Sequence, residues 1–163
     1  MAREWGLAQT HTTSTRPPLH RHTPTLISSA TSICFTDAAW QVETNRAGCG
    51  WLIKDHGGVC LAQGTFSFND TSSALVAEAL AVRSALLNAL ELGISRICIN
   101  TDCQALVAII SSDHHPADLH GIIRDIEHLS SSFDCISFAF IFRNLNYEAD
   151  SLAKTALYSP STN

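Results

Sequence analysis

Three absences in this sequence exclude whole classes of protein. No stretch approaches the roughly 18 to 20 uninterrupted apolar residues of a transmembrane helix, and the N-terminus lacks the apolar run of a secretory signal peptide. The six cysteines form no C-x-x-C pair and no Cys/His cluster with zinc spacing. We therefore expect a soluble intracellular protein of the nucleus or cytoplasm with reduced thiols. Organelle targeting stays open, because residues 6–30 contain no acids.

Basic charge is also scarce. The formal net charge is −5, and the residues after position 30 carry fourteen acids against seven bases. A nucleic-acid-binding domain normally presents a basic face, so this balance argues against one unless several acids hold cations.

The composition itself suits one globular domain with a tail. Hydrophobic residues make up 45% and charged residues 15% of the chain, which allows a well-buried core. Residues 6–30 are rich in Thr, Ser, Pro and His and show no apolar periodicity. We expect a disordered arm or linker over 1–30 and a folded domain over 31–160.

Hydrophobic patterning predicts an α/β domain. Three runs rich in β-branched and aromatic residues come first, with Asp-His-Gly-Gly at 55–58 as a hairpin signal. A helix follows, capped near 71–73 and closed by Gly93. The order is βββαβααβα, a five-stranded mixed sheet with flanking helices. The expected strands are Ser32–Trp40, Gly48–Asp55, Val59–Phe68, Arg96–Asp102 and Cys135–Arg143, and the later helices are Gln104–Ser111, Ala117–Ser131 and one that Asn146 caps and that runs to about Tyr158.

Two of the predicted strands run into the same dipeptide. Thr36-Asp37 ends the apolar part of the first strand, and Thr101-Asp102 ends the fourth. Because a helix connects these strands, they can lie parallel and adjacent, with both carboxylates beyond one sheet edge, where α/β folds form ligand sites. Each aspartate could also simply cap the turn that follows.

Two further acids stand on predicted helices. Glu78 is the only acid between Ser72 and Leu90, beside the apolar stripe, where an isolated charge needs a partner or a metal. Asp150 lies early in the last helix, where it could also just complement the helix dipole, as Glu148 could.

Four motifs together resemble the ribonuclease H family, and most closely the ribonuclease H-like domain of plant retrotransposon-type reverse-transcriptase relatives. They cover residues 32–158 in order and place the four carboxylates on strand, helix, strand end and final helix. The motifs are Phe35-Thr36-Asp37-Ala38-Ala39-Trp40, Ala77-Glu78-Ala79-Leu80-Ala81, Asn100-Thr101-Asp102-Cys103-Gln104 and Arg143-Asn144-x-Asn146-x-x-Ala149-Asp150-x-Leu152-Ala153-Lys154.

The resemblance implies a ribonuclease H-like fold and a metal-dependent endoribonuclease that hydrolyses the RNA strand of RNA–DNA hybrids. It implies two Mg²⁺ or Mn²⁺ ions, with Asp37 bridging them, Glu78 and Asp102 on one ion and Asp150 on the other. Gln104 matches a position that commonly contacts the hybrid. The basic residues flanking Asp150, Arg143 and Lys154, are our candidates for phosphate contact, although Lys154 could equally be a solvated side chain.

The sequence also departs from the family pattern. Residues 144–149 contain no histidine, and Phe140 stands where relatives often have one. Ala74 and Leu75 replace polar amides, and the interval from Asp102 to Asp150 has no room for a basic helical protrusion. The alternative is therefore a catalytically weak or inactive nucleic-acid-binding module that retains the fold. A proofreading-type exonuclease would need an acid at position 39, where Ala39 stands, and a transposase of the DDE type would place its glutamate last.

Overall fold

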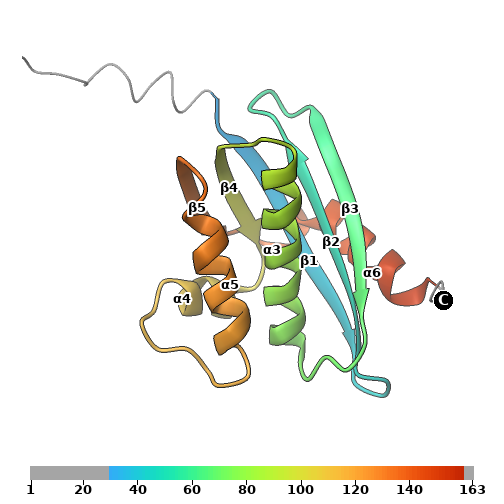
Figure 1. Ribbon diagram of the computed structural model, residues 1–163. Coiled ribbons are helices and arrows are strands. Elements are labelled where there is room, and N and C mark those ends of the chain that lie inside the picture. Colours follow the sequence, from blue (N-terminus) through green and yellow to red (C-terminus); the bar gives the residue numbers. More distant parts are fainter. Residues whose placement is uncertain (1–29, 160–163) are drawn as a thin grey trace, which may run out of the picture. The chain divides into compact units, whose positions relative to one another are not determined.

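A computed structural model describes residues 30–159, which contain a single five-stranded sheet (Figure 1). The strand order is β3-β2-β1-β4-β5. The strands are β1 (Ser32–Gln41), β2 (Arg46–Lys54), β3 (Cys60–Phe68), β4 (Arg96–Thr101) and β5 (Cys135–Phe140), and the helices are α3 (Ala74–Glu91), α4 (Gln104–Ile110), α5 (His120–Ser130), the short 3₁₀ helix η1 (Arg143–Leu145) and α6 (Tyr147–Tyr158). The predicted order βββαβααβα and the mixed sheet are confirmed.

The sheet register decides where the strand-end aspartates lie. β1 pairs antiparallel with β2 and parallel with β4, and β4 pairs parallel with β5. The β1–β4 ladder ends at the pair Thr36↔Thr101. The next residues along the two strands are Asp37 and Asp102, so both aspartates lie where the pairing between β1 and β4 ends, while β1 stays paired with β2.

Helices cover both faces of the sheet, α3 and α5 one face and α6 the other (Figure 1). α3 begins after Ser73, whose hydroxyl accepts a hydrogen bond from the Val76 amide, and ends before Gly93, which adopts φ 76°. The middle of its predicted apolar stripe is fully buried, as shown by Ala79, Val82 and Leu86.

Three element boundaries differ from the prediction by two residues or more, each for a local reason, and the other differences are of one residue. β2 begins at Arg46, because Asn45 takes the left-handed conformation (φ 53°) that closes the hairpin before it. β5 ends at Phe140, because β4 offers no partner beyond Thr101, whose carbonyl accepts the last bond from the Ile141 amide. α5 begins at His120, after a turn from Pro116 to Leu119.

Among the described residues, no helix is long and apolar enough to cross a membrane. The arm expected over residues 1–30 lies, except for Ala30, outside the described residues, and the division of the chain at that point stays a prediction.

Candidate metal centre

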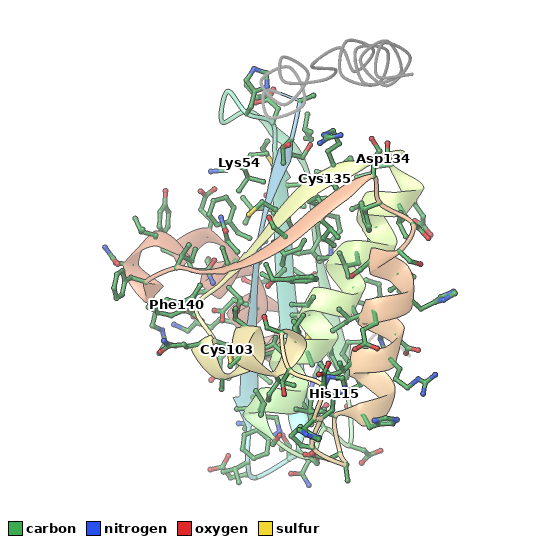
Figure 2. All side chains as sticks on the ribbon, turned by 90° about the vertical axis from the view of Figure 1, so that its left-hand side faces the viewer. Lys54, Cys103, His115, Asp134, Cys135 and Phe140 are labelled. Carbon is green, nitrogen blue, oxygen red and sulfur yellow. The ribbon has the colours of Figure 1, made fainter. Side chains whose placement is uncertain are left out.

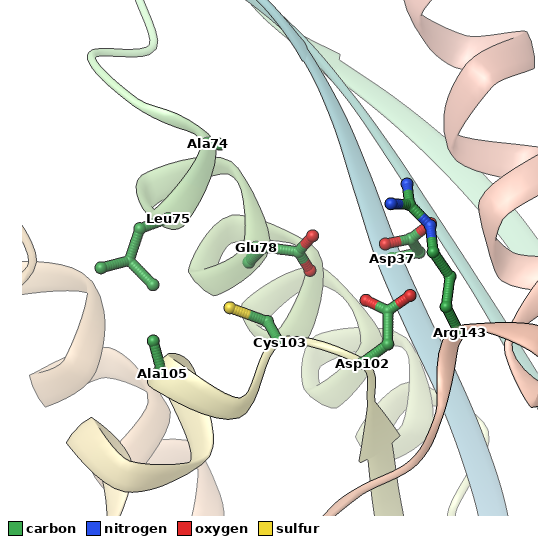
Figure 3. A pocket seen from close by; sticks show the side chains of 8 residues that line it. All are labelled: Asp37, Ala74, Leu75, Glu78, Asp102, Cys103, Ala105 and Arg143. Atoms are coloured by element: carbon green, nitrogen blue, oxygen red, sulfur yellow. The ribbon is translucent and has the colours of Figure 1, made fainter.

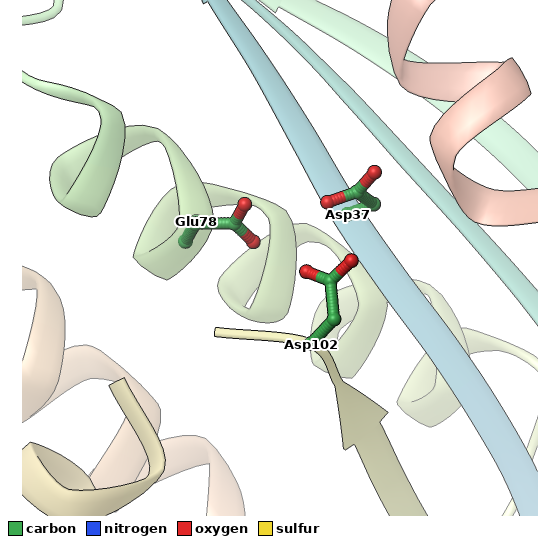
Figure 4. A group of neighbouring side chains, drawn as sticks. All are labelled: Asp37, Glu78 and Asp102. Carbon is green, nitrogen blue, oxygen red and sulfur yellow. The ribbon is translucent and has the colours of Figure 1, made fainter. Parts of the chain in front are cut away.

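Three carboxylates from three different elements meet at the end of the β1–β4 ladder (Figure 4). Asp37 comes from β1, Asp102 follows β4, and Glu78 lies in the second turn of α3. One carboxylate oxygen from each lies within 4.8 Å of the others. Glu78 is separated by 41 residues from Asp37 and by 24 from Asp102, so only the fold brings them together.

These carboxylates are at least half-buried, and not every one of their oxygens has a hydrogen-bond donor. Asp37 is only 2% exposed, and Glu78 and Asp102 are half-buried. Each retains one buried oxygen that no donor among the described residues satisfies: Oδ2 of Asp37, Oε2 of Glu78 and Oδ2 of Asp102. Native proteins seldom leave buried carboxylate oxygens unsatisfied, so the cluster lacks a positive partner.

Burial and mutual repulsion shift the acidity of this cluster. Burial, followed by the charge of Asp102, raises the pKa of Asp37 to about 7. Burial, followed by the charges of Asp37 and Asp102, raises the pKa of Glu78 to about 9. At neutral pH the cluster therefore holds protons unless a cation replaces them.

Asp150 lies beside Asp37 but has cationic partners of its own. Its carboxylate is 2.8 Å from Lys154 Nζ and 3.9 Å from an Arg143 nitrogen, with a side chain 22% exposed. Burial opposes ionisation of Asp150, but hydrogen bonds with Lys154 and Asp37 and the charges of Lys154 and Arg143 together lower its pKa. The fourth carboxylate is thus ionised and already paired.

Asn146 forms hydrogen bonds near both Asp37 and Asp150, which lie far apart in the sequence. We expected its side chain to cap α6, but it forms no cap hydrogen bond. Instead its buried Nδ2 donates to the carbonyl oxygen of Thr36, 2.9 Å away, and its own carbonyl accepts from the Asp150 amide. Asn146 therefore holds the start of α6 against the residue that precedes Asp37.

A pocket of about 410 Å³ opens onto the carboxylates (Figure 3). Figure 3 shows Arg143 on the side of Asp37 and Asp102, and Leu75 and Ala105 on the opposite side. Ala74 and Cys103 complete the lining, and Cys103 was not among the predicted site residues. Its position directly after Asp102 was the only signal in the sequence that could have indicated it.

The three predicted nucleic-acid contacts differ in their position and in their exposure. Arg143 lines it and is 78% exposed in its side chain, whereas Lys154 is occupied by Asp150. Gln104 is exposed at the first residue of α4, two positions after Asp102. Phe140 is register-paired with Thr101, at the same end of the sheet as Cys103 (Figure 2).

Comparison with known proteins agrees with this geometry. The sequence matches the reverse transcriptase-like family over residues 35–156. The ribonuclease H1 of the archaeon Halobacterium salinarum NRC-1 superposes with a TM-score of 0.73 at 25% identity, covering 78% of this chain and 98% of that one. LC11-RNase H1 in complex with an RNA/DNA hybrid gives 0.71 at 22% identity, covering 77% and 96%.

A viral protein places the same fold in a larger chain. The prototype foamy virus protease–reverse transcriptase superposes with a TM-score of 0.62 at 17% identity, covering 82% of this chain but 21% of that one. Curated protein sequences yield no significant match.

The fold is that of ribonuclease H. The chain belongs to the reverse transcriptase-like family.

Proposed function

We propose that this protein is a metal-dependent endoribonuclease that hydrolyses the RNA strand of RNA–DNA hybrids. The observation that carries the proposal is the cluster of Asp37, Glu78 and Asp102, with one buried and unsatisfied oxygen on each residue. The family supports a nuclease fold.

The donor set suits hard divalent cations such as Mg²⁺ or Mn²⁺. These ions take oxygen ligands, and the cluster offers several carboxylate oxygens within a few ångströms. Asp37 would bridge two ions, Glu78 and Asp102 would hold one, and Asp150 would hold the other. Bound there, such ions supply an activated water and stabilise the leaving 3′ oxygen.

The protein's own groups position the substrate. The β1–β4 ladder ends at the residues directly before Asp37 and Asp102 and so fixes where the two carboxylates emerge, and Ala74, Leu75 and Ala105 form an apolar wall of the pocket. Arg143 offers a guanidinium at the mouth for a phosphate, and Gln104 an amide for the hybrid. The 2′-hydroxyls of the RNA strand would distinguish it from DNA.

Support for the substrate comes from a similar structure, since LC11-RNase H1 was solved in complex with an RNA/DNA hybrid. Descent from a polymerase-linked domain is supported by the foamy virus protein, in which this fold forms part of a longer chain. The plant retrotransposon origin and the nuclear or cytoplasmic location stay predictions.

A second candidate is a nucleic-acid-binding module with little activity. Phe140 favours it, because it stands at the strand position where relatives often have a histidine, and a phenyl ring cannot transfer a proton as that histidine would. The acidic net charge also favours slow or weak engagement of a polyanion.

Cleavage of an end-labelled RNA–DNA hybrid tests the proposal. The wild type should cut the RNA strand internally with Mg²⁺ or Mn²⁺, and Asp102→Asn should not. Equal binding of the hybrid by both proteins in Ca²⁺, with no cleavage by either in Mn²⁺, would support the binding module instead.

A further inference from the structure

The fourth carboxylate, Asp150, differs from the other three because it forms ion pairs with two cationic side chains. Lys154 Nζ donates to Asp150 Oδ2 over 2.8 Å, and a terminal nitrogen of Arg143 lies 3.9 Å from Oδ1. Both Asp150 oxygens therefore face a positive group. By contrast, Asp37, Glu78 and Asp102 each retain a buried oxygen without a donor, and Asp37 is 2% exposed.

The geometry of α6 makes the Lys154 contact local. Asp150 and Lys154 are four residues apart on one helix, so their side chains share a face and meet without any loop movement. The pair is only partly buried, with side-chain exposures of 22% for Asp150 and 57% for Lys154. Exposed pairs of this kind are weak, so a divalent cation can displace the ammonium.

We propose that Lys154 is an internal counter-ion that competes with the second divalent cation for Asp150. The inference rests on the proposed function, because it concerns the cation that Asp37 and Asp150 would share. The first cation, held by the donor-free oxygens of Asp37, Glu78 and Asp102, meets no such competitor among the described residues. The two cations should therefore bind with clearly different affinities.

Displacement of Lys154 has a consequence for nucleic acid. Once a cation takes Asp150, the Lys154 ammonium and the Arg143 guanidinium lose their carboxylate and become available beside the pocket that Arg143 lines. A phosphate that engages them would in turn release Asp150 to the cation. Binding of the second cation and binding of a phosphate backbone should thus strengthen each other by the same factor.

Titration of the metal-free protein with Mn²⁺, without nucleic acid, tests the competition. Calorimetry and Mn²⁺ electron paramagnetic resonance would be recorded for the wild type, Lys154→Met and Lys154→Arg. Arg124→Met is the matched control, since Arg124 is an exposed cation on α5 and its loss changes net charge equally. The pair Asp150→Asn and Asp150→Asn/Lys154→Met completes a double-mutant cycle.

Lys154→Met should tighten the weaker Mn²⁺ site roughly two- to fivefold, which is the size of effect expected from an exposed ion pair. The tighter site should stay unchanged, Lys154→Arg should behave as the wild type, and Arg124→Met should have no effect. In the Asp150→Asn background the Lys154→Met effect should vanish.

An unchanged weaker site in Lys154→Met, or an equal gain in Asp150→Asn/Lys154→Met, would overturn the competition while leaving the tight site and the proposed function intact. No Mn²⁺ binding by the wild type would overturn both. Circular dichroism of each variant separates these outcomes from misfolding, and Lys154→Gln, which also removes the charge, replaces Lys154→Met if the latter does not fold.

Discussion

Two carboxylates, Asp37 and Glu78, should dominate the pH dependence of this domain's free energy of unfolding. The pKa values of Asp37 and Glu78 are raised from 3.8 and 4.5 to about 7 and about 9. Between the ordinary and the raised values the folded protein binds more protons than the unfolded chain, so the free energy of unfolding falls as pH rises. Cations that replace these protons should remove the loss.

We predict that metal-free protein loses stability steadily from pH 5 to pH 8, and that Glu78→Gln flattens this decline. Urea unfolding in chelator at several pH values measures it. The comparison of the two proteins isolates Glu78, because every other titrating group is shared. Parallel pH profiles for wild type and variant would show that Glu78 ionises normally.

Asp102→Asn should separate the effect of carboxylate–carboxylate repulsion on stability from the effect of metal binding. The substitution removes one charge that raises the pKa values of Asp37 and Glu78, and one metal ligand. In chelator the variant should melt no lower than the wild type. A ligand at a hundredfold excess over Kd stabilises by about 2.7 kcal/mol, or roughly 5–10 °C here. Mn²⁺ should produce such a rise in the wild type and much less in Asp102→Asn.

The measurement is a thermal melt of both proteins with chelator, Mn²⁺ and, as a size control, Ca²⁺. Equal metal responses in the two proteins would mean that the carboxylates do not form a metal site.

Asn146→Ala should weaken both the fold and the site. It leaves the buried Thr36 carbonyl without the Asn146 donor, which typically costs about 1–3 kcal/mol, and it loosens the start of the helix that carries Asp150. Denaturant unfolding and Mn²⁺ titration measure the two effects. Asn144→Ala, an exposed neighbour in η1, is the control and should change neither. Equal behaviour of the two variants would contradict the positioning role of Asn146.

At the scale of elements, the approach of α6 to β2 places Asp150 beside Asp37. Gly50 pairs with Asp37 across the β1–β2 ladder. A Cβ at Gly50 would lie 2.6 Å from the Ala153 amide nitrogen and 2.7 Å from the Ala149 carbonyl oxygen, both backbone atoms of α6. The helix can lie this close only because the strand has no side chain there.

Gly50→Ala should therefore push α6 outward and destabilise the protein by about 1–3 kcal/mol, as overpacking does. It should also weaken the Mn²⁺ site that needs Asp150. Gly121→Ala is the matched control: a Cβ there meets nothing within 4 Å, and its position on α5 predicts a slight gain in stability. A Gly50→Ala protein as stable as the wild type would contradict the close packing.

The secondary elements themselves were largely predictable from local chemistry. Ser73 and Gly93 delimit α3 as their capping preferences indicate, and alternation and turn residues located all five strands. The start of β2 and the end of β5 were wrong, because the left-handed Asn45 closes the hairpin before β2 and because β5 stops where β4 offers no further partner. The role of Asn146 was also missed, since no local pattern reveals a hydrogen bond to a carbonyl 110 residues away.

At the scale of the whole molecule, charge decides how a nucleic acid is held. With a net charge of −5, few phosphates can be neutralised, so hybrid affinity should be weak and its salt dependence shallow. Arg143→Ala should weaken binding alike for all hybrid sequences and reduce the salt slope by about 1. Fluorescence anisotropy in Ca²⁺ at several salt concentrations measures this, with Arg124→Ala on α5 as the control. A strong sequence preference, or no loss in Arg143→Ala, would contradict a phosphate contact.

The sequence by itself determined the order of the elements and indicated the four candidate acids. Periodicity, caps and turns act over a few residues, and Glu78 stands out because its helix is otherwise almost uncharged. Only the tertiary structure decided that three acids share one buried cluster while Asp150 is paired with Lys154. That division depends on where the β1–β4 ladder ends and how closely α6 approaches β2, and both follow from packing between segments distant in sequence.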